Sequence, residues 1–280
     1  MASLMLRHPG MDASDGHADP ASGVPGCYTS LALFANWFLG GGLPVLMYHK
    51  LGRCPPRTRL RGLYVDPALF HRQLAELADA GFRSVEPGGG PGAAGNPGRQ
   101  VVLTFDDGFE NVLRLGLEPL RAQGMLAIQY LVPGLLGRSN EWEQREGEVS
   151  ERLMDAVQVR EWLAAGHGIG AHTCTHPRLT EIPLNEAREE IRASKTMLED
   201  QFNVPVRHFC YPYGDWNPAV RDAVAEAGYE TACTTAPGLN QSGGDPFRLR
   251  RLTARRTPVQ WRTLGTCFRL WLVGRGQKTR

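Results

Sequence analysis

The sequence predicts an α/β fold, a distorted (β/α) barrel of about seven parallel strands. From residue 43 onward, short apolar runs rich in Val, Ile and Tyr alternate with helical patterns, which is typical of successive β-α units. With 280 residues and 42% hydrophobic content, the chain can bury one sizeable core. The candidate strands lie at 43–48, 82–86, 100–105, 126–132, 167–172, 206–212 and 229–235. Their number suits a barrel.

Two of the segments between these strands have clear helical patterns. The first begins with Asp66 and Pro67, an N-cap followed by proline at the first helical position, and stops at Gly81. Its apolar residues recur at helical spacing, at Leu69, Phe70, Leu74, Leu77 and Ala78. The second, at 184–202, carries Ala187, Ile191, Ser194 and Leu198 on one face. We expect both helices to cover the sheet.

Composition divides the chain into an N-terminal extension at 1–42, which we expect to be poorly ordered, and one barrel domain at 43–280. Within the domain, 87–98 is a Gly/Pro-rich connection and 140–151 is an acidic, polar insertion. The segment 257–273 predicts a basic C-terminal helix with Trp261, Leu264, Phe268 and Leu272 mostly on one face. We expect this helix to close the barrel. Alternatively, its basic flank recruits an anionic polymer or a membrane surface.

The charge distribution, the cysteine positions and the hydropathy pattern indicate which kinds of protein this chain can be. The net charge is only +2, but ten Arg or Lys residues and no acid follow Asp245, which indicates a basic C-terminal face. The six cysteines are scattered, so reduced thiols are favoured over a disulfide framework or a zinc ribbon. No apolar run reaches the roughly 20 residues that a transmembrane helix needs, and residues 1–42 contain no clear signal peptide.

Polar side chains gather directly after three of the predicted strands. Asp106 and Asp107 follow 100–105, His172 and His176 follow 167–172, and the sequence YPYG follows at 211–214. Active sites of parallel barrels lie at the carboxyl ends of the strands, so we expect these groups to meet. Two histidines and one carboxylate form a metal site with open positions, while the second aspartate stays free to act as a base. Taken separately, the sequences DDG and YPYG are also compatible with ordinary turns, and His172 with His176 is compatible with a helix start at the surface.

These motifs resemble those of the polysaccharide deacetylases, carbohydrate esterase family 4, in their order and spacing. The resemblance covers roughly residues 43–252 and rests on TFDDG (104–108), HTCTH (172–176) and YPYG (211–214). It implies a (β/α) barrel enzyme that hydrolyses N-acetyl groups on aminosugar polymers, or O-acetyl groups in some members. It also implies a divalent metal. We expect Zn²⁺, with Co²⁺, Ni²⁺ or Fe²⁺ as alternatives.

The resemblance assigns roles to individual residues. Asp106 is the expected general base, and Asp107, His172 and His176 are the expected metal ligands. The backbone N–H of Tyr213 is expected to hold the oxyanion. The rest of that motif is expected to contact the substrate, through Tyr211, Pro212 and Gly214.

Two positions depart from the common family pattern. Cys210 stands where many members have an arginine that orients the base, and Arg251 resembles an arginine that a subset carries near its last strand. Arg251 is therefore either the replacement or one more surface cation of the basic tail. No histidine follows His208, whereas many members have a C-terminal histidine as proton donor.

We expect His49 to be that donor, because it follows the first strand and so emerges at the same rim as Asp106. The stretch MYH at 47–49 resembles the start of poly-N-acetylglucosamine deacetylases. An ordinary pKa near 6.5 would suit this role. The alternative is a hydrogen-bonded structural histidine at a strand end.

The function predicted on this basis is metal-dependent hydrolysis of N-acetyl groups on an N-acetylglucosamine-containing polysaccharide or oligosaccharide, in exopolysaccharide or cell-envelope biosynthesis. The alternatives are a carbohydrate-binding pseudoenzyme and an O-acetyl esterase acting on a plant-type polysaccharide. The expected partner is a carbohydrate, and no nucleic acid is expected. For the compartment, the resemblance implies the envelope or secretion, whereas the absence of a clear signal peptide indicates the cytoplasm.

Overall fold

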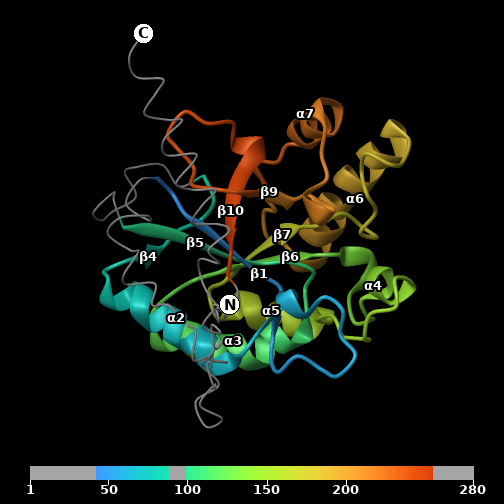
Figure 1. Cartoon of the computed structure of the whole chain (residues 1–280). Helices are drawn as coiled ribbons and strands as arrows, with labels where there is room; N and C mark the ends of the chain where they lie inside the picture. Colours follow the sequence, from blue (N-terminus) through green and yellow to red (C-terminus); the bar gives the residue numbers. More distant parts are fainter. Residues whose placement is uncertain (1–41, 89–98, 255–280) are drawn as a thin grey trace, which may run out of the picture.

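Seven parallel strands close into a barrel in the computed structural model, which describes residues 42–88 and 99–254 (Figure 1). The ring runs through β1 (Val45–Tyr48), β10 (Leu249–Thr253), β9 (Thr231–Pro237), β8 (His208–Cys210), β7 (Gly168–Ala171), β6 (Ile128–Leu131) and β5 (Gln100–Phe105). It closes because β5 also pairs with β1. The predicted fold class is confirmed.

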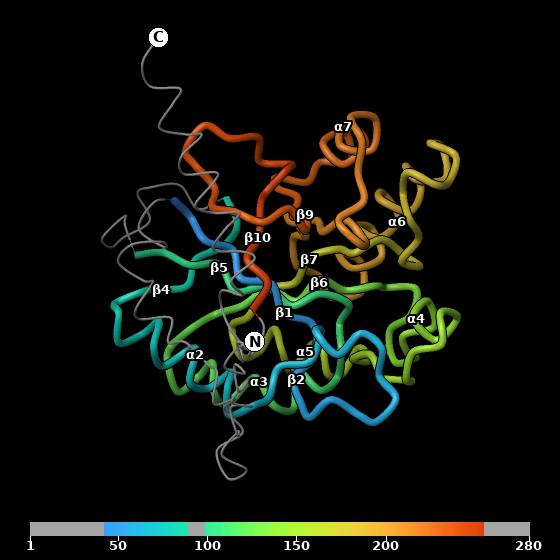
Figure 2. The backbone as a smooth tube through the Cα atoms, in the orientation of Figure 1, coloured from blue at the N-terminus to red at the C-terminus, as the bar shows by residue number. Residues whose placement is uncertain are grey.

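One member of the ring differs from the prediction. The predicted strand at 82–86 is β4 (Arg83–Ser84), which pairs only with β5 and lies outside the ring. The seventh place belongs to β10, which pairs with β9 and β1. Its sequence LRRLT contains two arginines, so it lacks the apolar run that identified the other strands. Figure 2 shows the first and last strands of the barrel next to each other.

Helices cover the outside of the barrel. α2 (Pro67–Asp79), α3 (Glu110–Ala122) and α5 (Ala156–Ala164) lie on one side in Figure 1, and α6 (Leu184–Phe202) and α7 (Pro218–Glu226) lie on another. Both helices expected from the sequence are confirmed. The Asp66 carboxylate accepts a hydrogen bond from the Ala68 N–H at the start of α2, and the predicted apolar face of α6 is buried.

The shorter elements are a second sheet and several single turns. β2 (Lys50–Leu51) and β3 (Tyr64–Val65) pair with each other just after β1. The insertion at 140–151 begins with a short helix, α4 (Glu141–Arg145), rather than a loop. Within residues 42–88 and 99–254 the 3₁₀ turns are η2 (Arg61–Leu63), η3 (Pro133–Leu135), η4 (Pro212–Gly214) and η5 (Pro246–Arg248).

Apolar side chains form two layers of core. The larger lies between the strands and the helices, and the smaller fills the barrel interior with Val45, Val102, Ile128, Tyr130, Cys210, Cys233 and Leu249. In the described part of the chain no helix combines the length and the apolar character needed to cross a bilayer. The predicted C-terminal helix at 257–273, and residues 1–41 of the predicted extension, lie outside the described residues.

Candidate active site

Three side chains from the ends of two strands converge on one point. Asp107 follows β5, while His172 and His176 follow β7. The Asp107 Oδ1 atom lies 3.4 Å from Nε2 of His172 and 3.3 Å from Nε2 of His176. Each of the three residues is at most 5% exposed. We call Asp107, His172 and His176 the metal triad.

An uncommon backbone conformation gives the triad its shape. Six non-glycine residues in the described ranges have a positive φ, and four of them lie at this site. These four are Asp107 (75°), Thr173 (64°), His176 (65°) and Tyr213 (59°). Such conformations are costly for residues with a Cβ and persist where the surrounding structure holds them, often at functional sites. The neighbouring carboxylates have different close partners, since Asp107 contacts the two histidines and Asp106 contacts Arg251.

The donor atoms of the triad fit a divalent cation. The Nδ1–H of His172 donates to the carbonyl oxygen of Cys210 at 2.7 Å, so in the neutral ring Nε2 carries a lone pair that faces Asp107. A lone pair that faces a carboxylate oxygen is repulsive unless a cation or proton lies between them. Burial raises the pKa of Asp107, but the close contacts with the His172 and His176 imidazoles outweigh burial and hold that pKa well below its usual range. Two imidazoles and one carboxylate are a donor set typical of Zn²⁺ and related ions.

The neighbouring aspartate, Asp106, pairs with a buried arginine from β10. Arg251 donates from Nη1 and Nη2 to the two carboxylate oxygens, each at 2.7 Å, and is 1% exposed. Its Nε–H also donates to the Thr234 carbonyl at 2.8 Å. Burial raises the pKa of Asp106, but the charge and hydrogen bonds of Arg251 bring that pKa below its ordinary value. Arg251 is thus not a surface cation of the basic tail.

His49 completes a second group with Asp106 and Arg251, which we call the base cluster. Its Nε2 lies 3.6 Å from Oδ2 of Asp106, and its side chain is 16% exposed. The position at the shared rim agrees with the prediction. Burial lowers the pKa of His49 below its ordinary value, although Asp106 and Asp107 act in the opposite direction. The expectation of an ordinary pKa near 6.5 was therefore wrong, because it ignored the loss of hydration at the rim.

The motif at 211–214 divides between the core and the site. Tyr211 is buried and donates its hydroxyl hydrogen to the Phe247 carbonyl at 3.1 Å, and Pro212 is also buried. Their placement argues against the predicted direct substrate contact by these two side chains. Gly214 has a φ of 72°, and a Cβ there would lie 2.1 Å from the Thr235 hydroxyl oxygen, so glycine is needed for packing. Only Tyr213, 36% exposed, lies at the site among these four residues.

A cleft of about 720 Å³ opens beside the triad, with His176 and Tyr213 in its lining. Its other wall comes from the insertion at 140–151, including Trp142 and Arg145. The Arg178 guanidinium lies over the Tyr213 ring, 3.9 Å from its centroid. Trp142 was not among the site residues predicted from the sequence. One signal was available, since Trp142 is the single aromatic residue in an otherwise polar insertion.

Comparison with known proteins identifies one family. The family described as polysaccharide deacetylase matches residues 93–232, which is half of the 280-residue chain. YxkH of Bacillus subtilis, whose name assigns it provisionally to the polysaccharide deacetylases, is 24% identical over 75% of this chain and 70% of its own. The chitooligosaccharide deacetylase of Sinorhizobium fredii is 28% identical over 48% of this chain. The match spans 56% of that relative's length.

A solved structure supports the fold. The Streptococcus pyogenes deacetylase PplD, determined in complex with acetate, superposes with a TM-score of 0.67 and 24% identity. The match covers 80% of this chain and 97% of that protein. At this identity the likeness extends to the fold alone, the closed parallel barrel with helices around it.

Proposed function

Because the chain belongs to the polysaccharide deacetylase family, we propose that it removes N-acetyl groups from a polysaccharide or oligosaccharide that contains N-acetylglucosamine. The observation that carries the proposal is the meeting of two different carboxylates at one rim. Asp107 joins two imidazoles, and Asp106 joins a guanidinium and a third imidazole. Amide hydrolysis with a metal needs such a pair, one carboxylate to bind and one to accept a proton.

Asp107, His172 and His176 are the residues that would hold the ion. The chemistry that a divalent metal supplies is polarisation of the acetyl carbonyl and a pKa of water lowered from about 15.7 towards about 7. Asp106 then needs only modest basicity to accept the proton of the attacking water. Arg251 keeps the Asp106 carboxylate ionised and holds both of its oxygens in place.

Two further groups act on the tetrahedral adduct. The backbone N–H of Tyr213 donates to the developing oxyanion, and one such donor is typically worth about 3 to 4 kcal/mol in the transition state. The sugar nitrogen must leave as an amine, which requires a proton. His49 lies beside Asp106, so it receives the proton that Asp106 took from the attacking water and delivers it to the nitrogen as the C–N bond breaks. Its lowered pKa makes the imidazolium a stronger acid.

The test is acetate release from three substrates, namely chitooligosaccharides, poly-N-acetylglucosamine and acetylxylan. We expect acetate release from at least one of the two N-acetylated substrates. A metal chelator should abolish this release, and added Zn²⁺ should restore it. The control is Asp106→Asn, which keeps the metal triad. Release from acetylxylan alone would instead identify an O-acetyl esterase. Binding of all three chains without acetate release would identify a carbohydrate-binding protein.

A further inference from the structure

The two histidines of the metal triad are held in different ways. His172 is oriented by the hydrogen bond from its Nδ1–H to the Cys210 carbonyl. The Nδ1 atom of His176 is buried, and no hydrogen-bond partner for it exists among the described residues. Metal-binding histidines normally use the second ring nitrogen in a hydrogen bond that fixes the ring. His176 must therefore be oriented by other contacts.

Aromatic rings surround His176 on several sides. The Trp142 indole is stacked on the imidazole, with centroids 4.3 Å apart and planes 20° apart. Tyr213 and His172 contact the imidazole edge-on, at 4.7 Å and 4.8 Å. A stacked ring restricts rotation about the Cβ–Cγ bond as a hydrogen bond would. If the imidazole rotates, it either loses contact with the indole or clashes with it. We propose that Trp142 is the positioning residue that directs Nε2 of His176 towards Asp107.

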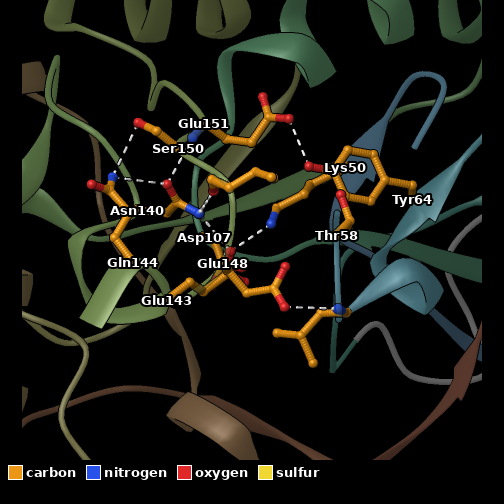
Figure 3. Close-up of polar contacts among 12 residues, drawn as sticks. Lys50, Thr58, Tyr64, Asp107, Asn140, Glu143, Gln144, Glu148, Ser150 and Glu151 are labelled. Carbon is orange, nitrogen blue, oxygen red and sulfur yellow. Dashed lines mark hydrogen bonds and ion pairs between the residues drawn. The ribbon is translucent and has the colours of Figure 1, made fainter. Parts of the chain in front are cut away.

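A buried ion pair places Trp142. The Lys50 ammonium lies 2.5 Å from Oε2 of Glu143, the residue after Trp142, and Lys50 is fully buried. Asn140, at the start of α4, donates to the same oxygen at 2.6 Å. The ammonium also lies 4.5 Å from the centroid of the Phe109 ring. Figure 3 shows Lys50 reaching across to Glu143 close to Asp107. The pair therefore ties α4, the helix that carries Trp142, to the residue after His49.

The rest of the insertion is tied to the same part of the chain. The Glu148 carboxylate accepts hydrogen bonds from the backbone N–H groups of Arg59 and Leu60. Glu151 accepts from the Tyr64 hydroxyl at 2.6 Å (Figure 3). The acidic residues of 140–151 therefore anchor the insertion to the segment that follows His49. This anchoring makes α4 a rigid support for Trp142.

The test measures the affinity for Zn²⁺, by competition with a chromophoric chelator, in Trp142→Leu and Trp142→Phe. We expect Trp142→Leu to bind Zn²⁺ about 10- to 100-fold more weakly, the usual effect of losing a group that orients a ligand. Trp142→Phe keeps a stacked ring and should stay close to wild type. The matched control is Trp162→Leu, because the Trp162 indole on α5 packs on His167, which is not a member of the triad, with centroids 4.2 Å apart. The Trp162→Leu variant should be less stable than wild type but should bind Zn²⁺ with the same affinity. Each affinity is measured under conditions in which the variant is folded.

The ion pair is tested by Lys50→Met/Glu143→Met, which removes both charges and so leaves no unpaired buried ion. We expect a loss of Zn²⁺ affinity of about tenfold. Lys195→Met/Glu199→Met removes a partly exposed Lys–Glu pair on α6, at 3.2 Å, and should leave the Zn²⁺ affinity unchanged. Unchanged affinity in the folded Lys50/Glu143 variant would remove the pair from the proposal.

The inference rests on the proposed function, because it assumes that the triad binds the metal. The outcomes of the experiment distinguish failure of the role of Trp142 from failure of the proposed function. If wild type binds Zn²⁺ and Trp142→Leu binds it equally well, the role of Trp142 is wrong and the proposed function stands. If wild type binds no divalent metal, both fail.

Discussion

The metal triad and the base cluster are neighbours at one rim, yet the chain assembles them in different ways. The triad takes its members from residues 107–176, from two strands and the turns that follow them. The base cluster joins Asp106 to His49 near the start of the barrel and to Arg251 in its last strand. The first depends on local backbone conformation, and the second depends on closure of the barrel by β1 and β10.

Cys210 connects the two groups. Its carbonyl oxygen accepts the hydrogen bond from His172, and its thiol lies 3.2 Å from Nη2 of Arg251. An arginine side chain at this position would compete with Arg251 for the space beside Asp106. The departure at Cys210 and the arginine on β10 are thus two parts of one arrangement. If the comparison is right, damage to the triad should remove the metal, whereas damage to the base cluster should remove turnover and leave the metal bound.

The largest effect is expected from His172→Ala/His176→Ala. This variant keeps one carboxylate of the three donors, so both metal content and acetate release should fall to background. Metal analysis of the purified, folded protein checks the first, and an acetate assay checks the second. Stoichiometric metal in the folded variant would contradict the assignment of the triad.

The next largest effect is expected from His49→Ala. Loss of a general acid should lower the turnover number by roughly 10²- to 10⁴-fold, while metal content and folding remain those of wild type. The measurement is steady-state acetate release beside metal analysis on the same preparation. A turnover number close to that of wild type would assign His49 to a structural role.

A smaller effect is expected from Arg251→Lys. Lysine keeps the charge but cannot make two parallel hydrogen bonds to Asp106, so we expect the turnover number to fall about 10- to 100-fold with the metal retained. Arg250→Lys is the matched control, because Arg250 precedes it on the same strand and is exposed. Equal turnover numbers in the two variants would show that the paired geometry at Asp106 is unimportant.

The smallest effect concerns the opposite end of the barrel, where His208 begins β8. Burial and the nearby charge of Arg207 lower its pKa to about 4. The unfolded chain, with a histidine pKa near 6.5, therefore binds the proton first. The stability contributed by the neutral ring is full above about pH 6.5 and is lost as the pH falls towards about 4.

Replacing His208 by Gln should make the fold less sensitive to acid. Between about pH 7.5 and about pH 5, the free energy of unfolding should fall by about 1 to 2 kcal/mol less in the variant than in wild type. Urea denaturation at both pH values measures this difference. His71→Gln, at an exposed position on α2, should behave as wild type does. Equal acid sensitivity of the unfolding free energy in all three proteins would contradict the lowered pKa of His208.

Residues close together in the sequence determined much of this protein without its tertiary structure. Alternating apolar and helical segments predicted the barrel, Asp66 and Pro67 predicted the start of α2, and DDG with HTCTH predicted the triad. These features depend on side-chain periodicity, capping and turn conformation over a few residues. The roles of Asp106, Asp107 and Tyr213 came from family resemblance on those same short motifs.

Only the tertiary structure decided which distant residues complete the site. The sequence was equally compatible with Arg251 as a surface cation of the basic tail and as a buried partner of Asp106. Closure of the barrel by β10 brings Arg251 to Asp106. Lys50 and Glu143 are separated by 93 residues, yet they meet in the interior. Trp142 reaches His176 because that pair anchors its helix. Sequence periodicity carries no information about such contacts, because they are stabilised by burial and charge pairing that exist only after the chain has closed on itself.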